Sequence, residues 1–322
     1  MLTRLKPYQV ILLERFRDKL TVLCVGHCGQ QQGSQFITET FQQDDLEREY
    51  TLYLPDDYDP EEPLPMVVTL HGRFQTGAEM GSYMDLHNFA NANDFIVLYP
   101  QALDGEWNFL HGIEGTTTGE HSDVDFINSV VDEVTEDYNV DVTRRYVMGM
   151  SNGGLMVQRI ACETPERYAA FASVASSAFN GMQFVCMEGG QQTAPMLLMH
   201  GTDDTNIPWD GLTSTASGQT VQLTLPVPEA LGFWAAFNGC NPSSDSSMFP
   251  SLGLSPGTEV RMLVVDCPEN TGVSLYAIVG GGHNYPGHDG LPVQLAGLVN
   301  KDIDANREIW AFFQRFTRVA GV

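Results

Sequence analysis

Two short stretches of the sequence share the pattern Gly-x-Ser-x-Gly, which can present a serine hydroxyl as a nucleophile. The first is GMSNG at 149–153, which holds Ser151, and the second is GLSPG at 253–257, which holds Ser255. A serine hydroxyl becomes reactive only when a neighbouring base takes its proton. The elements around each serine therefore decide which of the two is aimed at such a base.

Ser151 lies between an expected strand and an expected helix. It follows the expected strand 144–150, and a helical pattern begins directly after it. A sharp strand–turn–helix junction is the setting of a nucleophile elbow, and there the backbone N–H of the next residue, Asn152, points at the developing oxyanion. Ser255 is followed by Pro256, which has no N–H, and by a loop. We therefore predict Ser151 as the nucleophile and Ser255 as an ordinary loop residue.

Three histidines follow Ser151 and are candidates for its base, namely His200, His283 and His288. Folds with this type of elbow order their residues as serine, acid and histidine. His200 ends a buried apolar run, which favours a structural role, whereas His283 follows an apolar strand and three glycines. A histidine beyond a strand end is placed as catalytic residues usually are. His283 is the predicted base and His288 is the alternative.

The acid that orients the histidine should lie in a loop between Ser151 and His283, at the carboxyl edge of the sheet. The loop after the run PMLLMH offers Asp203 and Asp204, and a later strand is followed by Asp266. Spacing alone leaves all three aspartates open.

Buried apolar runs alternate with helical patterns along most of the chain, which predicts a mostly parallel sheet with helices on both faces. The expected strands are 48–55, 66–72, 95–100, 144–150, 168–178, 195–200, 258–266 and 272–282. The expected helices are 77–94, 122–140, 153–165, 228–238 and 300–316. The absence of a clear linker predicts one catalytic domain, 36–322, after an N-terminal tail or leader-like segment, 1–35.

Composition excludes some partners. The net charge of −25, from 41 acidic and 16 basic residues, argues against nucleic acid, whose phosphates need basic neutralisation. The sequence contains no run of 18 or more apolar residues, so we predict no transmembrane segment. The basic and then apolar character of residues 1–35 resembles an irregular signal peptide, so we expect a secreted or periplasmic protein. Cys24, His27 and Cys28 are too few for a convincing metal site, and no feature sets an oligomeric state.

Several stretches together resemble the polyhydroxybutyrate depolymerase and feruloyl esterase group of α/β-hydrolases, over residues 36–318. They are LHGRFQTG (70–77), FIVLYPQ (95–101), DVDFINSVVDEVTEDYNVD (123–141), GMSNGGLM (149–156), HGTDDTNIPWDG (200–211) and VGGGHNYPG (279–287). The resemblance implies an α/β-hydrolase fold, with Asp204 as the acid and His283 as the base. Expected strands and helices fill the segments between Ser151, Asp204 and His283, so we expect no large lid. The resemblance also implies a second oxyanion donor at the backbone of Arg73 or Phe74, where the group has small residues.

The same resemblance implies a serine esterase that works through an acyl-enzyme and needs no metal or organic cofactor. Its substrate would be an aryl or hydroxycinnamoyl ester or a polyester; alternatives are an acetyl-xylan type of ester, or a peptidase or thioesterase reaction with the same residues. A binding-only fold is a further alternative, which the survival of all three residue types disfavours. Trp107, Trp209, Tyr285 and Phe74 lie in loops after strands and are the candidate substrate walls. Tyr285 stands where the group usually has tryptophan.

The four cysteines of the body, Cys162, Cys186, Cys240 and Cys267, are compatible with two disulfides in an oxidising compartment. Four buried thiols are the alternative. The resemblance supports the pair Cys240–Cys267 more strongly than Cys162–Cys186.

Overall fold

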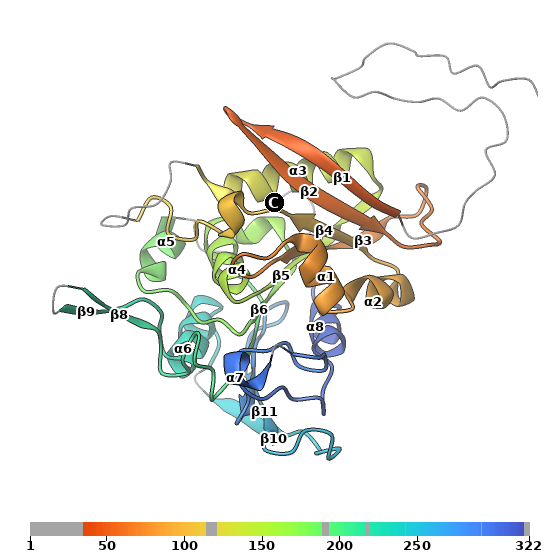
Figure 1. Cartoon of the computed structure of the whole chain (residues 1–322). Coiled ribbons are helices and arrows are strands. Elements are labelled where there is room, and N and C mark those ends of the chain that lie inside the picture. The colour runs from red at the N-terminus through yellow and green to blue at the C-terminus, as the bar shows by residue number, and fades with distance from the viewer. Residues whose placement is uncertain are drawn as a thin grey trace, which may run out of the picture. The chain divides into compact units, whose positions relative to one another are not determined.

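The computed structural model describes residues 35–113, 121–188, 193–216, 219–241, 243–290 and 292–318. The leader-like residues 1–34, with Cys24, His27 and Cys28, lie outside these ranges. The described chain forms one ten-stranded sheet with helices on both faces (Figure 1). Within these ranges, no helix combines the length and apolar character that crossing a bilayer requires.

The sheet has parallel strands at its centre and antiparallel strands at both edges. The strands are β1 (Gln35–Gln43), β2 (Leu46–Leu54), β3 (Leu64–Leu70), β4 (Ile96–Pro100), β5 (Val140–Met150), β6 (Ala170–Val174), β7 (Met196–Gly201), β10 (Ser244–Met248), β11 (Glu259–Val265) and β12 (Val273–Val279). Their order is β1-β2-β4-β3-β5-β6-β7-β12-β11-β10. The neighbours from β4 to β12 pair in parallel, as their continuous apolar runs predict.

Two hydrophobic layers enclose the sheet. One face packs against α3 (Asp123–Asp137), α4 (Asn152–Glu163) and α6 (Val227–Phe237), and the other against α1 (Gly77–Tyr83), α2 (Leu86–Asn93) and α8 (Ala305–Phe313). Because β5, β7 and β12 are parallel, the loops that follow them emerge at one edge of the sheet. This is the arrangement that the α/β-hydrolase resemblance implied.

Several elements differ from the sequence prediction. The single helix expected over 77–94 is two helices, because Asp85 between them adopts a left-handed φ of 49°. The strands β1 and β10, the hairpin of β8 (Thr213–Ala216) and β9 (Gln219–Gln222), and the short helices α5 (Met182–Glu188) and α7 (Val293–Ala296) were not expected. The unexpected strands are rich in Ser, Thr and Gln and lie at sheet edges or in a separate hairpin, so they lack an apolar signature.

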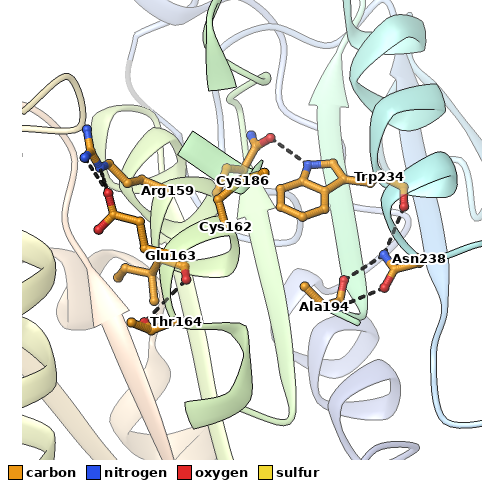
Figure 2. The surroundings of a disulfide bond; sticks show 10 residues. Arg159, Cys162, Glu163, Thr164, Cys186, Ala194, Trp234 and Asn238 are labelled. Carbon is orange, nitrogen blue, oxygen red and sulfur yellow. Dashed lines mark hydrogen bonds and ion pairs between the residues drawn. A yellow bond between two sulfur atoms is a disulfide. The ribbon is translucent and has the colours of Figure 1, made fainter. Parts of the chain in front are cut away.

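The favoured disulfide, Cys240–Cys267, is formed, and so is the less supported pair, Cys162–Cys186. Cys162, in the last turn of α4, pairs with Cys186 of α5 (Figure 2), and Cys240, after α6, pairs with Cys267, after β11. The pairs are 24 and 27 residues apart in the chain. Loops of this size give about 3–4 kcal/mol of stabilisation each in the chain-entropy model. The first disulfide therefore anchors α5 to α4, the helix that directly follows Ser151.

Candidate active site

The turn at Ser151 has the strained geometry of a nucleophile elbow. Ser151 joins β5 to α4 with φ 58° and ψ −121°, a conformation that L-residues rarely adopt. A Cβ atom at Gly153 would lie 2.2 Å from the carbonyl oxygen of Leu70, and one at Gly149 would lie 2.7 Å from the carbonyl oxygen of Gly153. The two glycines of the pattern are therefore required because β3, β5 and α4 meet too closely for any side chain.

Ser151, His283 and Asp204 come together at the carboxyl edge of the sheet. The Nε2 atom of His283 is 2.9 Å from Ser151 Oγ, and its Nδ1 atom is 2.7 Å from Asp204 Oδ2. The Asp204 side chain is fully buried, and the His283 side chain is 8% exposed. Each residue follows a different strand, β5, β7 or β12. The three residues form a continuous hydrogen-bonded chain from the carboxylate to the hydroxyl.

Backbone donors fix the orientation of the Asp204 carboxylate. Its Oδ1 atom accepts hydrogen bonds from the N–H groups of Asn206, at 2.8 Å, and Ile207, at 2.9 Å. The neighbouring Asp203 N–H donates to the carbonyl oxygen of Gly281 at 2.9 Å, which joins the acid loop to the histidine loop. Oδ2 is consequently left to face the histidine ring. Backbone N–H groups, and not mobile side chains, therefore hold the Asp204 carboxylate in place.

The other two candidate acids lie elsewhere. Asp203 is exposed, and its carboxylate accepts a hydrogen bond of 3.1 Å from the hydroxyl of Thr202. Asp266 is also exposed, and its carboxylate accepts from the side chain of Asn241 at 2.8 Å. The structure therefore separates the adjacent aspartates, which spacing alone left open.

The alternative histidine and serine are engaged in other contacts. His288 Nε2 lies 3.6 Å from Asp304 Oδ1. The hydroxyl of Ser255 accepts a hydrogen bond from the backbone N–H of Lys301 in the loop before β11. Neither residue joins the group around Ser151.

His200 occupies a buried structural position beside the acid, as its sequence context predicts. Its Nδ1 atom is 3.1 Å from the carbonyl oxygen of Ser176, and its Nε2 atom is 2.8 Å from the carbonyl oxygen of Ile207. Nε2 also lies 3.6 Å from Asp204 Oδ2. Burial lowers the pKa of His200, and its contacts join the acid loop to the loop after β6.

Acidification from about pH 7 to about pH 5.5 should lower the free energy of unfolding. Burial lowers the pKa of both His71 and His200. Below the ordinary histidine pKa of about 6.5, the unfolded chain binds protons that the folded chain does not, so stability falls by up to ~1.4 kcal/mol per pH unit for each histidine. Urea denaturation at both pH values measures this, and His200→Asn should give a shallower dependence. Equal stability of the wild type at both pH values would contradict it.

Two backbone N–H groups near Ser151 are free to bind an oxyanion. Within the described ranges, the N–H groups of Arg73 and Asn152 donate to no protein atom. The N–H of Phe74 instead donates to the carbonyl oxygen of Gly105 at 2.8 Å. Phe74 is therefore removed from the two expected alternatives for the second donor. Its side chain is 74% exposed on a backbone with φ 59°.

Two of the expected aromatic wall residues are buried, which corrects the sequence interpretation. Tyr285 is fully buried, with its hydroxyl donating to Asn306 Oδ1 at 2.8 Å, and Trp107 is 2% exposed. Trp209 retains partial exposure and its ring meets the buried His200 ring edge-on, with centroids 6.1 Å apart. Buried rings cannot border a solvent-facing substrate, so Trp209 and Phe74 remain the aromatic candidates.

Comparison with known proteins shows which family the chain resembles. Residues 48–206 match the family model described as esterase PHB depolymerase. Feruloyl esterase C of Emericella nidulans is 28% identical over 83% of this chain and 83% of its own length. The chain is similar to the polyhydroxybutyrate depolymerase and feruloyl esterase family. It is a serine carboxylic ester hydrolase with the α/β-hydrolase fold.

Two solved structures share the fold of this chain. Acetyl xylan esterase from Aspergillus awamori superposes with a TM-score of 0.59 at 16% identity, over 87% of this chain and 98% of that one. An S-formylglutathione hydrolase from Agrobacterium tumefaciens gives a TM-score of 0.55 at 13% identity, over 89% of this chain and 97% of that one. At such identities the likeness concerns the fold alone.

Proposed function

We propose that Ser151, His283 and Asp204 are the nucleophile, the general base and the orienting acid of this esterase. The supporting observation is the hydrogen-bonded chain from Asp204 through His283 to Ser151. Ser151 Oγ attacks the ester carbonyl carbon while His283 Nε2 takes the hydroxyl proton. Asp204 stabilises the imidazolium that results. The N–H groups of Arg73 and Asn152 stabilise the oxyanion of the tetrahedral intermediate.

The remaining steps use only these groups, the substrate and water. The tetrahedral intermediate collapses, the C–O bond of the ester breaks, and the alcohol leaves with the proton held by His283. Water then attacks the acyl-enzyme as His283 takes its proton, and Ser151 leaves as the restored hydroxyl when the acid is released. Water is the only co-reactant that this sequence consumes.

The proposed substrate is an aryl or hydroxycinnamoyl ester, or an ester within a polyester chain. The names of the matched family and of the Emericella nidulans relative support this class. Phe74 directly follows the proposed oxyanion donor Arg73 in the chain, and its ring is exposed. Arg73 itself points its guanidinium to Glu106, at 2.7 Å, so its charge is partly neutralised. A neutral aryl group suits this surface better than an anionic one.

Hydrolysis of a chromogenic aryl ester, and its loss after treatment with a fluorophosphonate, tests this function. Mass spectrometry of the treated protein should find the phosphonyl group on Ser151. The corresponding aryl amide should be cleaved far more slowly. If the protein neither hydrolysed the ester nor became labelled, a binding-only fold would be the remaining function. If it cleaved the amide as fast as the ester, it would be a peptidase.

Phe74→Ala and Trp209→Ala should each lower kcat/KM for a hydroxycinnamoyl ester by about tenfold, equivalent to ~1.4 kcal/mol, because the aromatic contact is lost. An acetyl ester, which has no ring to lose, should be affected less. Phe36→Ala is the matched control, because Phe36 is a half-exposed aromatic of the edge strand β1. Full hydroxycinnamoyl activity in both folded variants would remove these residues from the substrate site.

We also propose that residues 36–322 act as one catalytic domain, and that the protein works in a secreted or periplasmic setting. The two disulfides support an oxidising compartment, since such bonds persist there and are rare in reducing cytosol. An extracellular enzyme could reach a polymeric ester.

A further inference from the structure

Trp107 contacts both of the chain segments that carry the proposed oxyanion donors. Its backbone N–H donates to Asn152 Oδ1 at 2.7 Å, and the Asn152 side-chain amide donates back to the Trp107 carbonyl oxygen at 3.3 Å. Its indole N–H donates to the carbonyl oxygen of His71 at 2.9 Å. Asn152 begins α4, and His71 is two residues before Arg73.

We propose that Trp107 is a positioning residue that sets the separation of the two oxyanion donors, the N–H groups of Arg73 and Asn152. The proposal rests on the function proposed above. It assigns the buried indole to transition-state stabilisation instead of to the substrate wall. It also gives the Asn152 side chain a role separate from that of its own backbone N–H.

The contacts of the two segments with each other support this role. A Cβ atom at Gly153 would lie 2.6 Å from the same His71 carbonyl oxygen, so the start of α4 and the end of β3 already touch at this atom. The indole N–H binds that oxygen from a third segment. Trp107 therefore contacts the place where the two donor segments meet.

The segment 102–107, which ends at Trp107, contacts residues 71–74 at several points. The N–H of Ala102 donates to His71 Nε2 at 3.0 Å, and the carbonyl oxygen of Gly105 accepts from the N–H of Phe74 at 2.8 Å. The rings of His71 and Trp107 lie with centroids 5.0 Å apart. These contacts lie on both sides of Arg73 in the chain, and the N–H of Arg73 has no acceptor in the described part of the protein. Because this segment also binds the side chain of Asn152, it can fix the distance between Asn152 and Arg73.

Small displacements of oxyanion donors have large effects because the donors must already be in place when charge develops. Removing one such donor reduces kcat by about 10²–10³-fold. Displacing a donor without removing it should have a smaller effect. The effect should fall on kcat, since the oxyanion exists in the transition state and not in the bound ester.

Trp107→Phe tests the proposal, because it keeps a buried aromatic ring and removes only the indole N–H. We expect kcat for an aryl ester to fall about 10–100-fold with KM nearly unchanged. The affinity for an aryl trifluoromethyl ketone, whose serine adduct carries an oxyanion, should fall by a similar factor. Trp234→Phe is the matched control: Trp234 is fully buried, and its indole N–H donates to Gln158 Oε1 at 2.9 Å (Figure 2 labels Trp234).

Trp234→Phe should lower the melting temperature about as much as Trp107→Phe and leave kcat unchanged. A folded Trp107→Phe protein with wild-type kcat and ketone affinity would overturn the proposal. An equal loss of kcat in Trp234→Phe would overturn it as well, because the effect would then reflect general destabilisation.

Asn152→Ala provides a second variant if Trp107→Phe does not fold. It keeps the backbone N–H and removes both side-chain hydrogen bonds to Trp107, so kcat should fall in the same range. The double variant should lose less than the product of the two single losses, because both act through one contact. Wild-type kcat in Asn152→Ala would contradict the proposal. In all these outcomes, fluorophosphonate labelling of the wild type reports separately on the proposed function.

Discussion

Ser151→Ala should reduce kcat for a chromogenic ester by about 10⁶-fold while the protein stays folded. The alanine variant lacks the oxygen that attacks the carbonyl, so no acyl-enzyme forms and His283 has no hydroxyl proton to take. The substitution should leave the packing around residue 151 unchanged, because the two side chains differ by only one oxygen atom. Steady-state kinetics, with circular dichroism as a check of folding, measure the effect.

Ser255→Ala is the matched control, since Ser255 lies in the same sequence pattern. Its hydroxyl accepts a hydrogen bond from the N–H of Lys301 and, among the residues that the structure describes, is bonded to no histidine. The variant should keep near wild-type kcat and lose only about 1 kcal/mol of stability from the missing hydrogen bond. A folded but inactive Ser255→Ala protein, or a fully active Ser151→Ala protein, would contradict the assignment of the nucleophile.

The central part of this fold could be predicted because buried parallel strands leave a strong signal. The runs that became β3, β4 and β7 are continuous and apolar, and each lies almost fully buried between helix layers. The glycines around Ser151 were also informative, since the packing of β3 against α4 leaves no room for a Cβ at Gly153. Chain order then limited the candidates for acid and base.

The loops carried much less information about which side chains face the substrate. Trp107 and Tyr285 each follow a strand, but their polar atoms find buried partners in His71 and Asn306, so both rings turn inward. A loop has no periodicity from which such a direction could be deduced. The same holds for Phe74, whose N–H is taken by Gly105 for a reason that only the folded arrangement reveals.

The adjacent aspartates show the same limit at the acid. Residue types and spacing could not separate Asp203 from Asp204, and only the resemblance to a known family favoured the second. In the structure, the N–H groups of Asn206 and Ile207 bind one oxygen of Asp204 and direct the other at His283. That choice depends on how the turn closes after β7.

Asp204→Asn should reduce kcat by about 10⁴-fold, and the hydrogen bonds explain why. The asparagine oxygen would keep the place of Oδ1, where the N–H groups of Asn206 and Ile207 donate. Its NH₂ group would then face His283 Nδ1 and donate to it. The proton of the neutral ring would move to Nε2, the atom that must accept the proton of Ser151. The base would therefore be present, but in the wrong tautomer.

Asp203→Asn is the matched control, because it makes the same chemical change one residue earlier on an exposed side chain. It should change kcat by less than about threefold, since an exposed carboxylate contributes little to a buried group when its charge is screened by solvent. Steady-state kinetics of both variants with one aryl ester give the comparison. If Asp203→Asn were the more damaging change, the acid would be the earlier residue of the pair. If neither variant lost activity, the orienting carboxylate would have to be sought at Asp266, against the 2.7 Å contact between Asp204 and His283.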